Sequence, residues 1–163
     1  MHGKLPILML LVLAAGMSGC QKKPVKFSPD GSALPAPAAA PMEPFTLTIA
    51  SGGGFTGLYS GCALQSDGTV TFWQRIGARP DSILAKAAGS PAEIQGLLDR
   101  LRLGGALAST LRESGNMTTV VKLEIADSVR TWSWAGSGVD DKTPEPFMTW
   151  YPEAQAYCSG LFP

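Results

Sequence analysis

The chain has 163 residues, and its 13 basic side chains balance its 13 acidic ones, so the formal net charge at neutral pH is zero. A neutral chain without clustered Lys and Arg lacks the positive field that holds nucleic acid, so we predict no nucleic-acid partner. Its single histidine, His2, lies in a segment that we expect to be cleaved off, which excludes a Ser-His-Asp triad, a Cys-His pair and a His-ligated zinc site.

The first expected element is a secretory leader over residues 1–19. Lys4 precedes an uncharged apolar run, residues 5–15, which is too short to span a bilayer because a spanning helix needs about 20 apolar residues. Residues 16–19 (GMSG) are small or flexible enough to enter a protease cleft, and Cys20 follows them directly. Cleavage before Cys20 leaves 12 basic side chains, the 13 less Lys4, against 13 acidic ones.

The end of this leader closely resembles the lipobox of bacterial lipoprotein signals: Ser18 and Gly19 fit that pattern, and Met17 stands where leucine is usual. The resemblance implies that Cys20 is S-diacylglycerylated and that its new N-terminus is open to a further acyl chain such as palmitate. Two or more chains anchor firmly, because each buried methylene contributes about 0.8 kcal/mol. Gln21 in place of Asp implies, by the sorting rule of Gram-negative lipoproteins, an outer-membrane anchor with the domain facing the periplasm or the cell surface. An ordinary signal peptide with an incidental cysteine is the alternative.

Residues 20–44 follow as the lipidated cysteine and a linker rich in proline and alanine, without an apolar period. A linker of this composition is extended where proline is dense, at about 3.1 Å per residue, and holds a folded domain clear of the bilayer. Residues 45–163 have the size of one domain and enough chain to bury a single core.

The first part of this domain shows the alternation of strands. In FTLTIAS, from residue 45, apolar side chains alternate with threonines, which is typical of a half-buried strand. LYSGCALQ (58–65) and TVTFWQR (69–75) continue the pattern, and Asp67-Gly68 between them is typical of a hairpin turn. Residues 77–89 are mixed and interrupted by a proline, so no element is predicted there.

A helix is expected over residues 91–103, where leucines recur at helical spacing. Ser90 and Glu93 form a capping box around a proline, and two glycines follow the helix. A second hairpin is expected over 118–135, and the tail 147–161 is expected to be helical after Pro152. The order β-β-β-α-β-β-α predicts an α+β fold: an antiparallel sheet of about five strands with one or two helices packed on one face.

Cys62 and Cys158 are the two cysteines that remain once Cys20 is lipidated. In an oxidising compartment they are expected to form a disulfide between the second strand and the last helix, with two buried free thiols as the alternative. A catalytic dithiol is not expected, because the CxxC spacing is absent.

The glycine-rich stretch SGGGFTG, residues 51–57, separates the first two expected strands. It is not a phosphate-binding loop, because no Lys-Ser/Thr pair and no helix follow its last glycine. Its residue types alone favour a wide hairpin turn. The alternative is a partner-facing loop that exposes Phe55 at its tip.

The string SGGGFTGLYSGCALQSDGTV resembles emfourins, small bacterial inhibitors of thermolysin-like metalloproteases, in its Gly-Gly-Phe-x-Gly element. Gly53, Gly54, Phe55 and Gly57 match that element. The resemblance implies a domain that occupies a protease cleft without being a substrate, with these four residues as the candidate contacts. The lipid anchor, the long linker and the expected disulfide depart from the soluble members of that family.

These observations predict an envelope lipoprotein that is not an enzyme, that holds no metal, cofactor or small-molecule substrate, and whose domain binds a protein, such as a protease that it inhibits. The main alternative is an accessory subunit of an outer-membrane complex, which an exposed aromatic patch around Trp150 and Tyr151 would favour. An inhibitor of a cell-wall lytic enzyme and an enzyme using two carboxylates are further alternatives. The acidic loop at Asp140 and Asp141 is predicted to be a solvated turn rather than a calcium site.

Overall fold

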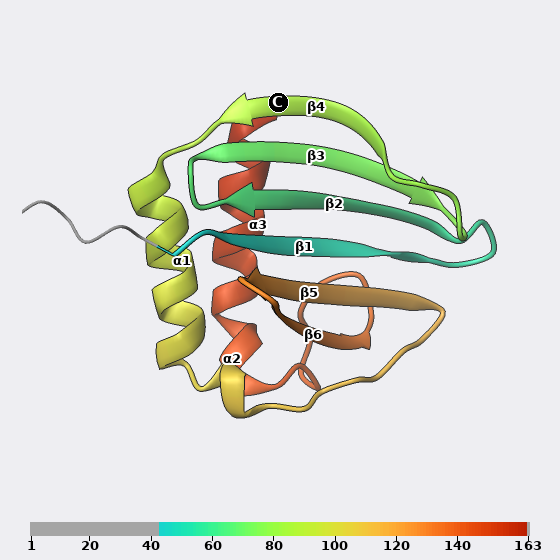
Figure 1. Cartoon of the computed structure of the whole chain (residues 1–163). Coiled ribbons are helices and arrows are strands. Elements are labelled where there is room, and N and C mark those ends of the chain that lie inside the picture. The colour runs from blue at the N-terminus through green and yellow to red at the C-terminus, as the bar shows by residue number, and fades with distance from the viewer. Residues whose placement is uncertain (1–42, 163) are drawn as a thin grey trace, which may run out of the picture. The chain divides into compact units, whose positions relative to one another are not determined.

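The computed structural model describes residues 43–162, which form a six-stranded antiparallel sheet with helices on one face (Figure 1). The strand order is β4-β3-β2-β1-β5-β6. The strands are β1 (Phe45–Gly53), β2 (Leu58–Gln65), β3 (Thr69–Ile76), β4 (Ser82–Ala88), β5 (Met117–Ile125) and β6 (Ser128–Ala135), and the helices are α1 (Pro91–Leu103), a 3₁₀ turn (Ala106–Ala108), α2 (Glu145–Met148) and α3 (Trp150–Leu161). The predicted α+β class with antiparallel pairing is confirmed, and the sheet has six strands rather than about five.

The central strand β1 separates the two faces of the sheet. Its side chains Phe45, Leu47 and Ile49 are buried in the core beneath the helices, whereas Thr46 and Thr48 lie on the opposite face. The core face of the neighbouring strands carries Cys62, Leu64, Val70, Val121, Leu123 and Trp132. The period of two along each strand therefore decides which residues meet the helices.

Helix α1 begins at the predicted Ser90 cap, but the capping box is only half formed, because the backbone N–H of Ser90 donates to the hydroxyl of Tyr157 at 2.8 Å rather than to Glu93. The Ser90 side chain accepts a hydrogen bond from the backbone N–H of Glu93 at 3.3 Å. The buried stripe of α1 consists of Ile94, Leu97, Leu98 and Leu101. Helix α3 begins at Trp150, two residues before Pro152 rather than after it, because the first turn of a helix tolerates a residue without an N–H donor.

The aromatic residues of the tail are core residues. The Trp134 ring lies 5.2 Å from Phe147 and 5.5 Å from Tyr151, between ring centroids. Trp150 donates from its indole N–H to the backbone carbonyl of Leu97 at 2.8 Å, which fixes α3 against α1. Trp150 and Tyr151 are only 3% and 2% exposed, so the exposed patch around them that would favour the accessory-subunit alternative is absent from the described residues.

One strand, β4, is not predicted by the sequence pattern. It is an edge strand whose Ile83 and Leu84 are exposed, and its pairing register with β3 shifts at Leu84. An inserted residue of this kind breaks the period of two, which removes the signal by which a strand is recognised.

The acidic loop before α2 is a self-contained turn. The carboxylate of Asp140 accepts hydrogen bonds from the backbone N–H of Lys142 at 2.9 Å and from the hydroxyl of Thr143 at 3.2 Å. Within residues 43–162, no helix is long and apolar enough to cross a bilayer. The predicted leader, Cys20 with its predicted lipidation, and nearly all of the predicted linker lie outside the described residues.

Candidate protein-contact site

Of the matched residues, Gly53 ends β1, and Gly54, Phe55 and Gly57 lie in the connection between β1 and β2, at the end of the strands away from α1 (Figure 1). The three glycines have φ angles of 119°, 66° and 59°. These values lie in the region that side chains with a Cβ rarely adopt, so glycine is required for this turn. The wide hairpin turn that the residue types favour is what the structure shows.

Neighbouring loops fix the backbone of this connection. The N–H of Gly54 donates to the carbonyl of Asn116 at 2.5 Å, and the N–H of Gly77 donates to the carbonyl of Gly57 at 2.9 Å. Within the turn, the N–H of Gly57 donates to the carbonyl of Gly54 at 3.2 Å. The turn is therefore held from both sides, by the residue before β5 and by the turn after β3.

Phe55 extends from this turn with its side chain fully in solvent, at 108% relative exposure. The sequence left open whether Phe55 would be exposed at the tip of this turn, and the structure shows that it is. Burying a phenylalanine side chain normally contributes about 1.5 to 3 kcal/mol to the stability of the fold. The exposed Phe55 makes no such contribution in the free domain.

A row of apolar side chains lies beside the turn and was not predicted from the sequence. Gly53 pairs with Leu58 and with Met117, and Leu58 pairs with Ile76, so the row crosses β5, β1, β2 and β3 on one face. Met117, Leu58 and Ile76 are 37%, 38% and 51% exposed. We call Phe55, Leu58, Ile76 and Met117 the distal surface.

The opposite face of the sheet has a different character. There the Trp73 ring covers Gly61, since a Cβ on that glycine would lie 2.5 Å from the indole Cζ2. The Arg75 guanidinium lies 5.6 Å from the Trp73 ring centroid and 5.8 Å from that of Tyr59, and it pairs with Asp81 at 3.5 Å. The Trp73 and Tyr59 rings of this face therefore lie next to the charged Arg75 side chain, unlike the solvent-exposed ring of Phe55.

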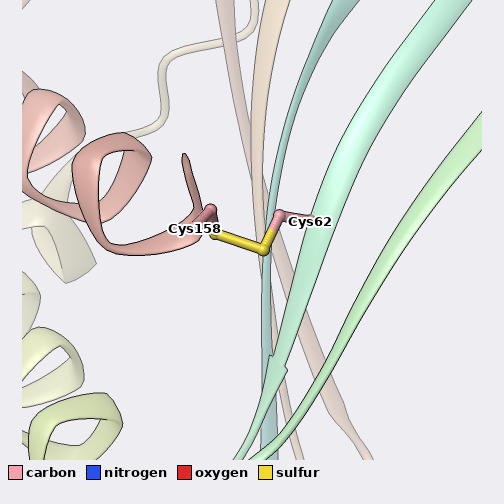
Figure 2. Close-up of a disulfide and its surroundings, with 2 residues drawn as sticks. All are labelled: Cys62 and Cys158. Carbon is pink, nitrogen blue, oxygen red and sulfur yellow. A yellow bond between two sulfur atoms is a disulfide. The ribbon is translucent and has the colours of Figure 1, made fainter. Parts of the chain in front are cut away.

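Cys62 and Cys158 form a disulfide between β2 and α3 (Figure 2). Both residues are buried, and 96 residues separate them in sequence. The bond fixes the second half of α3 against the centre of the sheet.

Tyr151 lies in the first turn of α3, under the sheet residues next to the distal surface. Burial raises the pKa of its hydroxyl above the ordinary value of 10.0, while hydrogen bonds to the side chains of Ser51 and Thr119 oppose that rise. The phenol is therefore neutral in the folded domain at all physiological pH values.

We expect Tyr151 to make the domain less stable at alkaline pH. The unfolded chain releases this proton near pH 10.0 while the folded domain retains it, so the stabilisation is complete below that pH and is lost as pH rises through the folded-state pKa. Denaturant melts from pH 8 to pH 11 should show a smaller alkaline loss in the Tyr151→Phe variant. An equal loss in both proteins would assign the effect to another group.

Comparison with protein-family models finds no match for this chain, and comparison with curated proteins finds none either. The resemblance to emfourins therefore stays a prediction that rests on the Gly-Gly-Phe-x-Gly element.

Proposed function

We propose that this chain is an outer-membrane lipoprotein, anchored through Cys20, whose domain binds another protein through the distal surface and inhibits a thermolysin-like metalloprotease. The observation that carries the contact site is the fully exposed Phe55 on a backbone that Asn116 and Gly77 hold in place. The protease as partner comes from the emfourin resemblance.

The distal surface has the composition of a protein-contact site. Aromatic side chains that fill a pocket on the partner contribute most to such interfaces, and Phe55 is available for that role. Leu58, Ile76 and Met117 beside it would complete an apolar contact area around this anchor. Because the turn is already fixed in the free domain, binding loses little conformational entropy.

The same hydrogen bonds would oppose cleavage of the turn by a bound protease. A protease cleaves a segment that can extend locally into its active site. The backbone groups of Gly54 and Gly57 are engaged with Asn116 and Gly77, so extending the turn would break these bonds. The turn is therefore suited to occupy a cleft without being a substrate.

The test is a titration of a thermolysin-like protease with the mature chain and with its Phe55→Ala variant. We expect inhibition by the native chain and about 30-fold weaker inhibition by the variant, the effect of losing an anchor that contributes about 2 kcal/mol. Leu103→Ala is the matched control, since Leu103 is an equally apolar side chain, 87% exposed, on α1 at the opposite end of the strands (Figure 1).

The identity of the partner and the location of the contact site are tested by different results. Full protease activity at a large excess of the native chain would remove this class of protease as the partner. Inhibition by Phe55→Ala equal to that of the native chain would remove the turn as the contact. The melting temperature should be the same in all three proteins, because neither substituted side chain is buried.

A further inference from the structure

A groove of about 510 Å³ lies between α3 and the core face of the sheet. The helices cover only the half of this face that is nearer α1, and β1, β2 and β3 continue past them (Figure 1). The sheet side of the groove includes Ser51, Ser60 and Phe72, and the helix side includes Gln155 and Ser159. The volume lies in the range of about 300 to 1,000 Å³ that is usual for ligand sites.

The floor of the groove is continuous with the distal surface. Ser51 pairs with Ser60, and the next pair on the same face of these strands is Gly53 with Leu58. Two residues along a strand span about 6.6 Å, so two further residues of an extended partner segment are enough to reach from Leu58 to the groove.

The residues that line the groove carry no charge. No Asp, Glu, Lys or Arg is among them, whereas the hollow on the opposite face of the described sheet is lined by Arg75, Asp81, Lys86, Lys122 and Glu124. A charged occupant would lose its hydration in the groove without gaining a partner of opposite charge. The groove is therefore matched to an uncharged occupant.

The groove also presents polar side chains on both of its walls. Ser51 and Ser60 lie on the sheet side, and Gln155 and Ser159 lie on the helix side, around the apolar rings of Phe72 and Phe162. The Ser51 side chain already has a hydrogen-bond partner in Tyr151, which also lines the groove. A purely aliphatic chain would cover the other polar groups without offering them a hydrogen bond, which is unfavourable. The amides of a polypeptide offer both donors and acceptors to them, and its apolar side chains would contact the rings.

We propose that this groove binds an uncharged, apolar segment of the partner polypeptide, next to the part that contacts Phe55. The inference shares one premise with the proposed function, which is that the partner of this domain is a protein. It does not depend on that protein being a protease.

The probe is the blocked peptide acetyl-Ala-photoleucine-Phe-Ala-amide, added to the mature chain in lipid nanodiscs and cross-linked by light. Mass spectrometry should place the cross-links on residues that line the groove. A control peptide with Asp in place of Phe should give at least tenfold less cross-linked product. Equal labelling by the two peptides, or no labelling of the groove, would overturn the proposal. Labelling of the groove by a photoreactive dodecanol but not by the peptide would assign it to a lipid chain instead.

Two substitutions that lower the volume of the groove provide a second test of the proposal. Ser60→Trp should abolish the labelling, whereas Ala63→Trp, on the opposite face of the same strand, should leave it unchanged. If Ser60→Trp lowers the melting temperature, Ala85→Leu narrows the groove with a smaller side chain and should reduce labelling several-fold. Phe55→Ala should leave labelling unchanged, so the groove and the protease proposal give separate results. Unchanged labelling in both groove variants contradicts the inference.

Discussion

The Cys158→Ala variant should lose about 2 to 5 kcal/mol of its free energy of unfolding, as is usual when a small secreted domain loses its disulfide. The disulfide closes a long loop, since its cysteines are 96 residues apart in sequence. Chain entropy alone predicts roughly 4 to 5 kcal/mol for a loop of that order, because the cross-link restricts the unfolded chain. This loss is a large fraction of the total stability of a domain, which is about 5 to 15 kcal/mol.

Urea melts of the native chain, with and without a reductant, measure this loss directly. The Cys62→Ala, Cys158→Ala double variant should be close in stability to the single variant, and the reductant should have no effect on it. Both cysteines are buried, so alanine is preferred to serine, which would add a buried hydroxyl. A loss below about 1 kcal/mol would show that packing alone holds α3 on the sheet.

The Cys20→Ser variant should pass from the membrane fraction to the soluble fraction. Removing the acyl chains removes about 0.8 kcal/mol of membrane affinity for each methylene, and the remaining chain is nearly neutral, with little attraction to anionic lipid. Cell fractionation measures the change, and the matched control is Ser18→Ala, which keeps a small residue two positions before the cysteine.

Intact-mass spectrometry of the native chain provides the second measurement. The expected mass is that of a chain that begins at Cys20 and carries acyl chains. A native chain that retains residues 1–19, or one that begins with an unmodified thiol, would contradict the anchor and with it the predicted location.

The local pattern of apolar and polar residues along the chain was sufficient to predict most of the strands and helices. The alternation of apolar residues with Thr46 and Thr48 predicts β1, and the Ser90 cap with Glu93 predicts where α1 begins. β4 was missed because Ile83 and Leu84 are exposed at an edge and the register shift at Leu84 interrupts the alternation. A strand of this kind is specified by its pairing with β3, which the sequence pattern does not show.

The candidate site was predictable only in part. Phe55 could be recognised as a candidate because glycines flank it. The row beside it depends on the pairing of Gly53 with Met117, 64 positions further along the chain, and no local period reveals that register. Trp150 and Tyr151 are buried, so the exposed aromatic patch around them that would have favoured the accessory-subunit alternative is not formed. Their burial follows from contacts with Leu97 and Trp134, which only the fold brings near.

Site-specific photo-cross-linking tests most directly whether the distal surface is where the partner binds. The mature chain carries p-benzoylphenylalanine in place of Phe55, or in place of Leu103 as the control, and is irradiated with a thermolysin-like metalloprotease. A cross-linked complex from the first protein and none from the second is the result we predict. Equal cross-linking from both positions, or no cross-link from position 55 while the protease is inhibited, would contradict it.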